Sequence, residues 1–337
     1  MRLGVLDIGS NSANLRVVDA YPGSPPLPVY RLKTPTRLAE EIRADGTVGV
    51  AGVKRLVAAV CSAVDAARGY DVVELIPFAT SAVRDAANRD QIVTALRSEA
   101  GVDIGFLPGE EEGRITYFAA HRWYGWSAGP LLVLDIGGGS MEIVQGRDED
   151  PALALSLPLG AGRLTRSHLR DHPASPKQVK RLRRHIRDVL APAVQRVSLE
   201  GRRHKVVATS KTFKQLARFA GTTDPSLPAG TRVLTRNQVE KWVPRLAAMG
   251  PAERAQLPGV PRARARQLLA GAVVAATAMS ALDADRVEIC PWALREGILL
   301  RRVAPLPRPD TLRQVKLVES SSATVSRLDE HRQNRHG

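Results

Sequence analysis

The sequence predicts an α/β protein built from two similar halves, and three observations carry this prediction. Its 337 residues exceed the roughly 100–200 residues of one ordinary domain. The hydrophobic content of 44% and charged content of 25% are values of globular proteins. An apolar run that ends in Asp-Ile-Gly, followed by small and hydroxylated residues, occurs at 3–12 and again at 131–140. Because these matched segments open successive halves, we expect a duplicated domain.

In the first half, short apolar runs alternate with stretches whose apolar residues recur at helical spacing. The predicted strands are 3–8, 13–20, 29–33, 75–79 and 102–107. The predicted helices are 53–68, 84–99 and 110–122. The last of these carries acids in its first turn, where the helix dipole favours negative charge.

The second half shows the same alternation. The predicted strands are 131–136, 141–145, 153–157, 205–208 and 286–289. The predicted helices are 176–198, 211–219, 236–249, 262–282 and 294–302. We therefore expect a first domain at 1–124, a second at 125–302 and a disordered tail at 303–337, which is polar and has no apolar face.

The net charge of +15 is unevenly distributed along the chain. Residues 1–159 carry −5, residues 160–266 carry +18 and residues 267–337 carry +2. A polyanionic partner for the middle of the chain is the first hypothesis. Composition by itself leaves nucleic acid, an anionic membrane surface and a phosphate polymer open.

The N-terminus and the cysteines indicate a cytoplasmic protein. Asp7 interrupts the apolar stretch that a secretion signal needs. No unbroken apolar run is long enough to span a bilayer, so we expect no membrane partner. Cys61 and Cys290 lie far apart in apolar surroundings, which favours two buried free thiols over a disulfide.

The two Asp-Ile-Gly turns are predicted phosphate-binding loops. Turns rich in Gly and Ser direct several backbone N–H groups into one space, where a phosphate can approach closely. One such turn alone is an ordinary tight turn, but two matched turns favour phosphate binding. The predicted phosphate-binding residues of the loops are Gly9, Ser10, Asn11, Ser12, Gly137, Gly138, Gly139 and Ser140.

Acidic residues beside these turns are candidates for catalysis and metal binding. Asp7, Asp135 and Glu142 suit Mg²⁺, which takes one or two carboxylates together with water and substrate phosphate. Glu112 could orient and deprotonate a water that attacks a phosphoanhydride, although acids at a helix start are often only a solvated cap. Arg84, between a strand and a helix, suits phosphate binding, with a surface ion pair as the alternative.

In combination and order, these segments resemble the exopolyphosphatase and guanosine pentaphosphate phosphohydrolase (Ppx/GppA) family, which belongs to the superfamily of actin, sugar kinases and heat-shock ATPases. The resemblance extends from Leu3 to about Arg302. Its carriers are residues 7–12, 79–86, 108–114, 135–142 and 294–297.

The resemblance implies duplicated actin-like (ribonuclease H-like) domains with the active site in an interdomain cleft. It implies release of terminal phosphate from inorganic polyphosphate, with Mg²⁺ or Mn²⁺ as metal and K⁺ as a stimulating ion. It places Glu112 at the catalytic base, Asp135 and Glu142 at the metal- and water-positioning acids, and Arg84 at a phosphate-binding arginine. A homodimer and a preference for short chains are further expectations.

Two departures refine the resemblance. A turn that is usually Gly-Gly-Thr in the family reads Ala208-Thr209-Ser210-Lys211 here. Lys211 therefore argues against the binding of a nucleotide base at this turn, and it offers a cation to phosphate. The chain also lacks the C-terminal His-Asp domain of longer members, as in the short two-domain form found in actinobacteria.

The sequence therefore predicts an exopolyphosphatase whose polymer runs over a basic channel. The channel residues are Arg163, Arg166, Lys180, Arg181 and Arg184. The alternatives are hydrolysis of guanosine pentaphosphate (pppGpp), a kinase, a solvated arginine-rich helix face, and a non-catalytic regulator that binds polyphosphate or nucleic acid. The acids Glu112, Asp135 and Glu142 oppose the last alternative, because a pure binder gains nothing from acids that face a polyanion.

Overall fold

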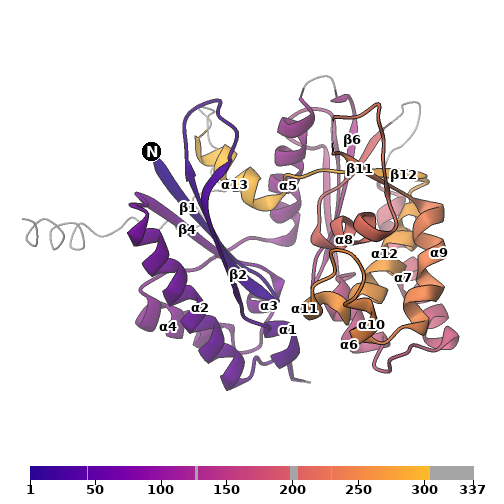
Figure 1. Ribbon diagram of the computed structural model, residues 1–337, viewed down its shortest axis with the longest axis horizontal. Coiled ribbons are helices and arrows are strands. Elements are labelled where there is room, and N and C mark those ends of the chain that lie inside the picture. Colours follow the sequence, from indigo (N-terminus) through magenta and orange to yellow (C-terminus); the bar gives the residue numbers. More distant parts are fainter. Residues whose placement is uncertain (44, 126–127, 198–203, 229, 304–337) are drawn as a thin grey trace, which may run out of the picture.

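The computed structural model describes residues 1–303 except 44, 126–127, 198–203 and 229. The chain forms two lobes that lie side by side, each built around one β-sheet (Figure 1). The predicted tail falls outside the described residues from 304 onward. The proposed division between 124 and 125 stays a prediction.

The first lobe is formed around a five-stranded sheet in the order β3-β2-β1-β4-β5. Its strands are β1 (Arg2–Ile8), β2 (Ser12–Asp19), β3 (Pro28–Pro35), β4 (Glu74–Ala79) and β5 (Gly105–Phe106). The first three pair antiparallel, whereas β4 pairs parallel to β1 and β5 pairs parallel to β4. Its helices are α1 (Leu38–Glu41), α2 (Val50–Gly69), α3 (Ser81–Arg84) and α4 (Arg89–Ala100).

The second lobe is formed around a seven-stranded sheet in the order β10-β11-β12-β9-β6-β7-β8. Its strands are β6 (Leu131–Ile136), β7 (Met141–Gly146), β8 (Leu153–Leu157), β9 (Lys205–Ala208), β10 (Thr222–Thr223), β11 (Arg232–Thr235) and β12 (Arg286–Ile289). The segment β8-β7-β6-β9-β12 repeats the pairing directions of β3-β2-β1-β4-β5. The predicted duplication is therefore confirmed.

Helices cover the outer face of the second sheet. They are α6 (Ala161–His168), α7 (Pro176–Val194), α8 (Lys211–Phe219), α9 (Arg236–Ala248), α10 (Pro251–Arg254), α11 (Arg262–Ala265) and α12 (Leu268–Ala281). Nearly all of α12 is buried, and it packs against α6, α7, α8 and α9. Helices that are apolar all round are interior helices, and α12 forms the centre of the largest core cluster.

Two helices, α5 (Gly109–Tyr124) and α13 (Leu294–Val303), form an inner layer between the sheets (Figure 1). Alternate residues of a strand face opposite sides of the sheet. Leu3 and Val5 of β1 pack with α13, and Leu131 and Val133 of β6 pack in the cluster that includes α5. The two helices also pack against each other. Asp7 and Asp135 occupy the next alternate positions of the same two strands, so they also face the inner layer.

Two predicted helices are interrupted. The helix expected at 84–99 breaks between α3 and α4, because the side-chain amide of Asn88 bonds to the backbone of Val48. Asn88 Nδ2 donates to Val48 O (3.0 Å), and Asn88 Oδ1 accepts from the Val48 N–H (2.9 Å). The helix expected at 262–282 divides into α11 and α12. Helix α6 and strand β11 have no counterpart in the prediction.

The two cysteines differ from the expectation in one respect. Both cysteines are free, but only Cys290 is buried, since Cys61 is half-exposed on α2.

Within the described ranges, no helix combines the length and apolarity needed to cross a bilayer.

Candidate active site

The two glycine turns of the repeated hairpins meet between the lobes. Each turn closes on itself: Gly9 N–H donates to Ser12 O (3.1 Å) and Gly137 N–H to Ser140 O (2.9 Å). A Cβ atom added at Gly138 would lie 2.5 Å from Ser10 Oγ of the other lobe. Such a distance is far below van der Waals contact, so the approach of the loops requires glycine here.

Helix α6 fixes the second loop from behind. Ala161 N–H donates to Gly137 O (3.0 Å), and Arg163 donates through its N–H to Gly138 O (2.9 Å) and through Nε to Gly139 O (2.8 Å). A trans peptide directs its N–H opposite to its C=O. Because α6 binds the carbonyls, the N–H groups of these peptide units are turned away from α6, in the manner of an anion-binding nest.

Asp135 and Glu142 are paired across the hairpin of the second lobe. They lie opposite each other in the register of β6 and β7. Thr209 Oγ1 donates to Asp135 Oδ2 (2.6 Å), and Ser156 Oγ donates to Glu142 Oε1 (2.9 Å). Burial raises the pKa of both carboxyls, and the Asp135 charge also helps to bring the pKa of Glu142 to about 8.

Glu112 reaches the same site from the first turn of α5. Its side chain is 12% exposed and pairs with Arg84, which also donates to Leu107 O (2.7 Å). Burial and the nearby charge of Glu142 raise the pKa of Glu112, and the Arg84 guanidinium partly offsets this rise. The structure thus brings together Glu112, Glu142 and Arg84 as the sequence predicted, from three separate elements.

Positive charges surround Asp7. Arg295 Nη1 lies 3.6 Å from Asp7 Oδ2, and Arg264 lies in the electrostatic field of Asp7 and Asp135. Lys211 begins α8 beside them. Burial and the charges of Arg295 and Arg264 lower the pKa of Lys211 to about 7. These are the cations that a phosphate ligand would meet in the site.

The predicted metal set fits Mg²⁺ only in part. In the described part of the chain, no group of three or more His, Cys, Asp or Glu side chains is arranged around a common metal position. Asp7 faces Arg295 instead. Asp135 and Glu142 remain suitable, because Mg²⁺ takes one or two carboxylates plus water and substrate oxygens, and because these two residues lie opposite each other in the register of β6 and β7.

Several residues of this site were not identified from the sequence. They are Ser81, Ser156, Thr209, Arg264 and Arg295. Arg295 lies in a segment that resembles the family, but that segment carried no assigned role. For Arg264 the sequence offers no signal, since it meets its partners only through the tertiary fold. Ser156 lies opposite Glu142 in the register of β7 and β8, so antiparallel pairing of these two predicted strands could have found it.

The predicted channel residues fall into two groups. Arg163 and Arg166 lie near the loops, where Arg163 pairs with Asp85 of the first lobe (3.0 Å) and Arg166 reaches toward Ala39 O (3.5 Å). Lys180, Arg181 and Arg184 are exposed on α7.

The profile of the Ppx/GppA phosphatase family matches residues 17–305. The chain belongs to this family. It is 45% identical over 328 residues to Exopolyphosphatase 1 of Mycobacterium bovis, covering 97% of this chain and 94% of that protein. It is 44% identical over 304 residues to Exopolyphosphatase 1 of Mycobacterium leprae, covering 90% of each.

Solved structures of the Ppx/GppA family share the fold. A family member from Aquifex aeolicus has a TM-score of 0.73 at 25% identity, covering 90% of this chain and 97% of that one. An exopolyphosphatase from Cytophaga hutchinsonii has a TM-score of 0.79 at 20% identity, covering 90% and 98%. The predicted fold class, duplicated actin-like domains, is thus confirmed.

Proposed function

We propose that the protein is an exopolyphosphatase that hydrolyses the terminal phosphoanhydride of inorganic polyphosphate. Two observations together carry the proposal: the two glycine turns face each other, and the largely buried Glu112 interacts electrostatically with Glu142 and pairs with Arg84. Relatives at 44–45% identity that are named exopolyphosphatases support it. The Ppx/GppA membership supports a phosphatase in general.

Glu112 would act as the general base. A raised pKa makes its carboxylate a stronger proton acceptor, and its buried position excludes bulk water from competing. Arg84 would hold the carboxylate in place and neutralise charge that develops on the transferred phosphoryl group. The N–H groups of the two turns would bind the terminal phosphate, and Lys211, Arg264 and Arg295 would neutralise its charge.

Asp135 and Glu142 would hold Mg²⁺ in this proposal. When bound, the ion supplies positive charge to the phosphate oxygens. Thr209 and Ser156 would orient the two carboxylates through their hydroxyl groups. Homodimer formation, a cytoplasmic location and a preference for short chains stay predictions.

Replacement of the proposed base tests this function. We expect Glu112→Gln to lower kcat for polyphosphate about 100- to 10,000-fold, because the amide cannot accept the proton. Glu110→Gln removes one charge from the same helical turn at an exposed position and is the matched control.

Phosphate release would be measured with tripolyphosphate, long polyphosphate, pppGpp and ATP in the presence of Mg²⁺. Equal rates for Glu112→Gln and wild type would refute the role of Glu112. Faster wild-type turnover of pppGpp than of any polyphosphate would assign the protein to the other activity named in its family.

A further inference from the structure

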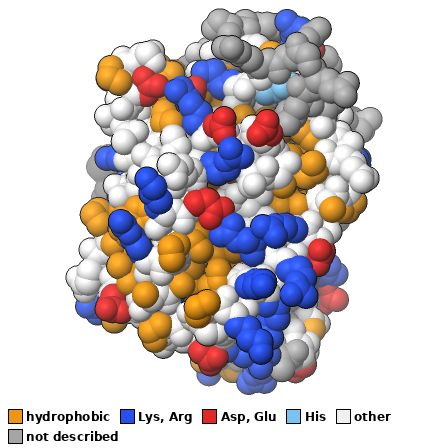
Figure 2. Space-filling view, turned by 90° about the vertical axis from the view of Figure 1, so that its right-hand side faces the viewer, with side chains coloured by type: hydrophobic (Ala, Val, Ile, Leu, Met, Phe, Trp, Pro, Cys, Tyr) orange, Lys and Arg blue, Asp and Glu red, His pale blue; other side chains and the backbone are white. Residues whose placement is uncertain are grey.

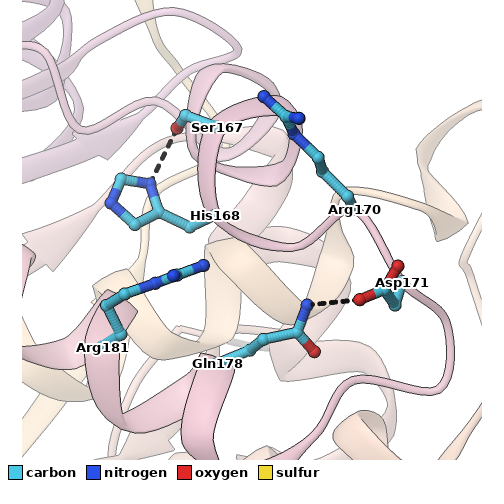
Figure 3. A pocket seen from close by; sticks show the side chains of 6 residues that line it. All are labelled: Ser167, His168, Arg170, Asp171, Gln178 and Arg181. Atoms are coloured by element: carbon cyan, nitrogen blue, oxygen red, sulfur yellow. Dashed lines mark hydrogen bonds between the residues drawn. The ribbon is translucent and has the colours of Figure 1, made fainter.

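A surface pocket lies at the far end of α6, apart from the glycine loops. It has a volume of about 440 Å³ and is lined by Ser167, His168, Arg170, Asp171, Gln178 and Arg181. Figure 3 shows His168 and Arg181 on one side of it and Asp171 on the other. The pocket combines the end of α6, the connection after it and the first turns of α7.

Two guanidinium groups of this pocket are available for a ligand. Neither Arg170 nor Arg181 forms an ion pair or hydrogen bond with another described side chain, and both are exposed. Arg183 of the same helix is different, because both of its Nη atoms bond to Glu240 (2.7 and 2.9 Å). Asp171 is the negative group in the lining, and it accepts from Gln178 Nε2 (2.9 Å).

Helix α6 connects the pocket to the glycine loop. Arg163, in its first turn, donates to Gly139 O, and Ser167 and His168 form its last residues. At a rise of about 1.5 Å per residue, Arg163 and His168 are about 8 Å apart along the helix axis. Arg166 projects between these ends. The helix thus carries two arginines between the catalytic loop and the pocket.

The wider surface has the same electrostatic character. The region 160–266, which includes α6 and α7, carries a net charge of +18. Figure 2 shows Lys and Arg side chains gathered over the lower part of the second-lobe face. Clustered positive charge over low-dielectric walls attracts a polyanion and holds it near the surface.

We propose that this pocket is a second phosphate-binding site, which holds an internal segment of a polyphosphate chain whose terminal phosphate lies in the catalytic loops. Arg170 and Arg181 bind the phosphate oxygens, and Gln178 Nε2, which gives one N–H to Asp171, donates its other N–H. The site rests on the proposed function for its ligand. Only chains that reach from Gly139 past Arg163 to the end of α6 can occupy both sites.

The charge-removing double variant Arg170→Ala/Arg181→Ala tests the site. We expect KM for long polyphosphate to rise roughly tenfold, since two partly exposed charge contacts of about 0.5–1 kcal/mol each are lost. We expect kcat, and KM for tripolyphosphate, to stay within twofold, because tripolyphosphate is too short to occupy the loops and the pocket together. The unchanged tripolyphosphate reaction also shows that the variant folds.

Arg187→Ala is the control, since it removes one arginine from the same helix one turn beyond Arg183, on the side that faces α9. An equal rise of KM in pocket and control variants, or an equal rise for both chain lengths, would refute the pocket. Failure of the wild type to hydrolyse either chain would refute the proposed function instead. Direct binding of long polyphosphate to Glu112→Gln, with and without the pocket substitutions, tests the pocket without turnover.

Discussion

At the scale of single residues, both repeats have an Asp before the turn, but they differ at the residue that lies opposite this Asp in the neighbouring strand. Asp7 and Asp135 are equivalent, and their register partners are Asn14 and Glu142. Asn14 Nδ2 donates to Ser12 O (3.2 Å) and stabilises its own turn. Glu142 instead adds a second carboxylate to the site. Duplication thus supplied two similar turns, of which one carries the acid pair.

Ser156 should act as a positioning residue for Glu142. We expect Ser156→Ala to lower kcat about tenfold, the usual effect of losing one hydrogen bond to a charged group. Loss of this bond also raises the pKa of Glu142 further, so the activity should reach its maximum at a higher pH than in wild type. Ser98→Ala, on an exposed face of α4, is the control. An unshifted pH profile would contradict the role.

The buried acids should make the metal-free protein less stable as the pH rises. The folded pKa of Glu142 is about 8, above the ordinary value of 4.5. Between these values the folded state binds more protons than the unfolded state, so the free energy of unfolding falls with increasing pH. Glu142→Gln removes this penalty.

Thermal unfolding of Glu142→Gln and wild type without divalent cations would measure this effect. We expect the variant to have the higher Tm at pH 8 and a smaller advantage at pH 5. A constant difference between the two proteins at both pH values would show that Glu142 does not titrate in this window.

At the scale of elements, α13 and α5 approach each other more closely than ordinary helix packing allows. A Cβ atom at Gly297 would lie 2.2 Å from Ile115 O. We expect Gly297→Ala to lower the free energy of unfolding by about 1–3 kcal/mol through overpacking. Urea denaturation would measure it. Gly69→Ala, at the open end of α2, should be neutral or stabilising.

The elements also show what the sequence could predict. The strands before both turns and the start of α5 follow from local apolar patterns, so the elements that carry Glu112, Asp135 and Glu142 could be predicted. The catalytic and metal-binding roles of these residues stay predictions. Arg295 meets Asp7 from the opposite end of the described chain, and no local pattern encodes such a contact. The break at Asn88 was missed for the same reason, because its side-chain amide bonds to the backbone of Val48, 40 residues earlier in the chain.

At the scale of the whole molecule, the charge is divided between a weakly acidic first part and a basic second part. We expect KM for long polyphosphate to rise more steeply with salt than KM for tripolyphosphate, because a long chain displaces more counterions from the basic surface. Steady-state kinetics between 50 and 200 mM KCl, a range over which such effects are about 10³-fold or more for nucleic acids, would measure both slopes. Parallel slopes would contradict a role for this surface.

The return of α13 to the first sheet also determines the order in which the protein can fold on the ribosome. Ile298 and Leu299 complete the cluster that contains Leu3, Val5 and Phe78. These strand residues are synthesised near the beginning of translation, but their covering helix is made almost 200 residues after β5. At about 5–20 residues per second, this delay is roughly 10–40 s. During that interval the nascent first lobe presents an uncovered apolar face, which makes it a natural client for a ribosome-associated chaperone.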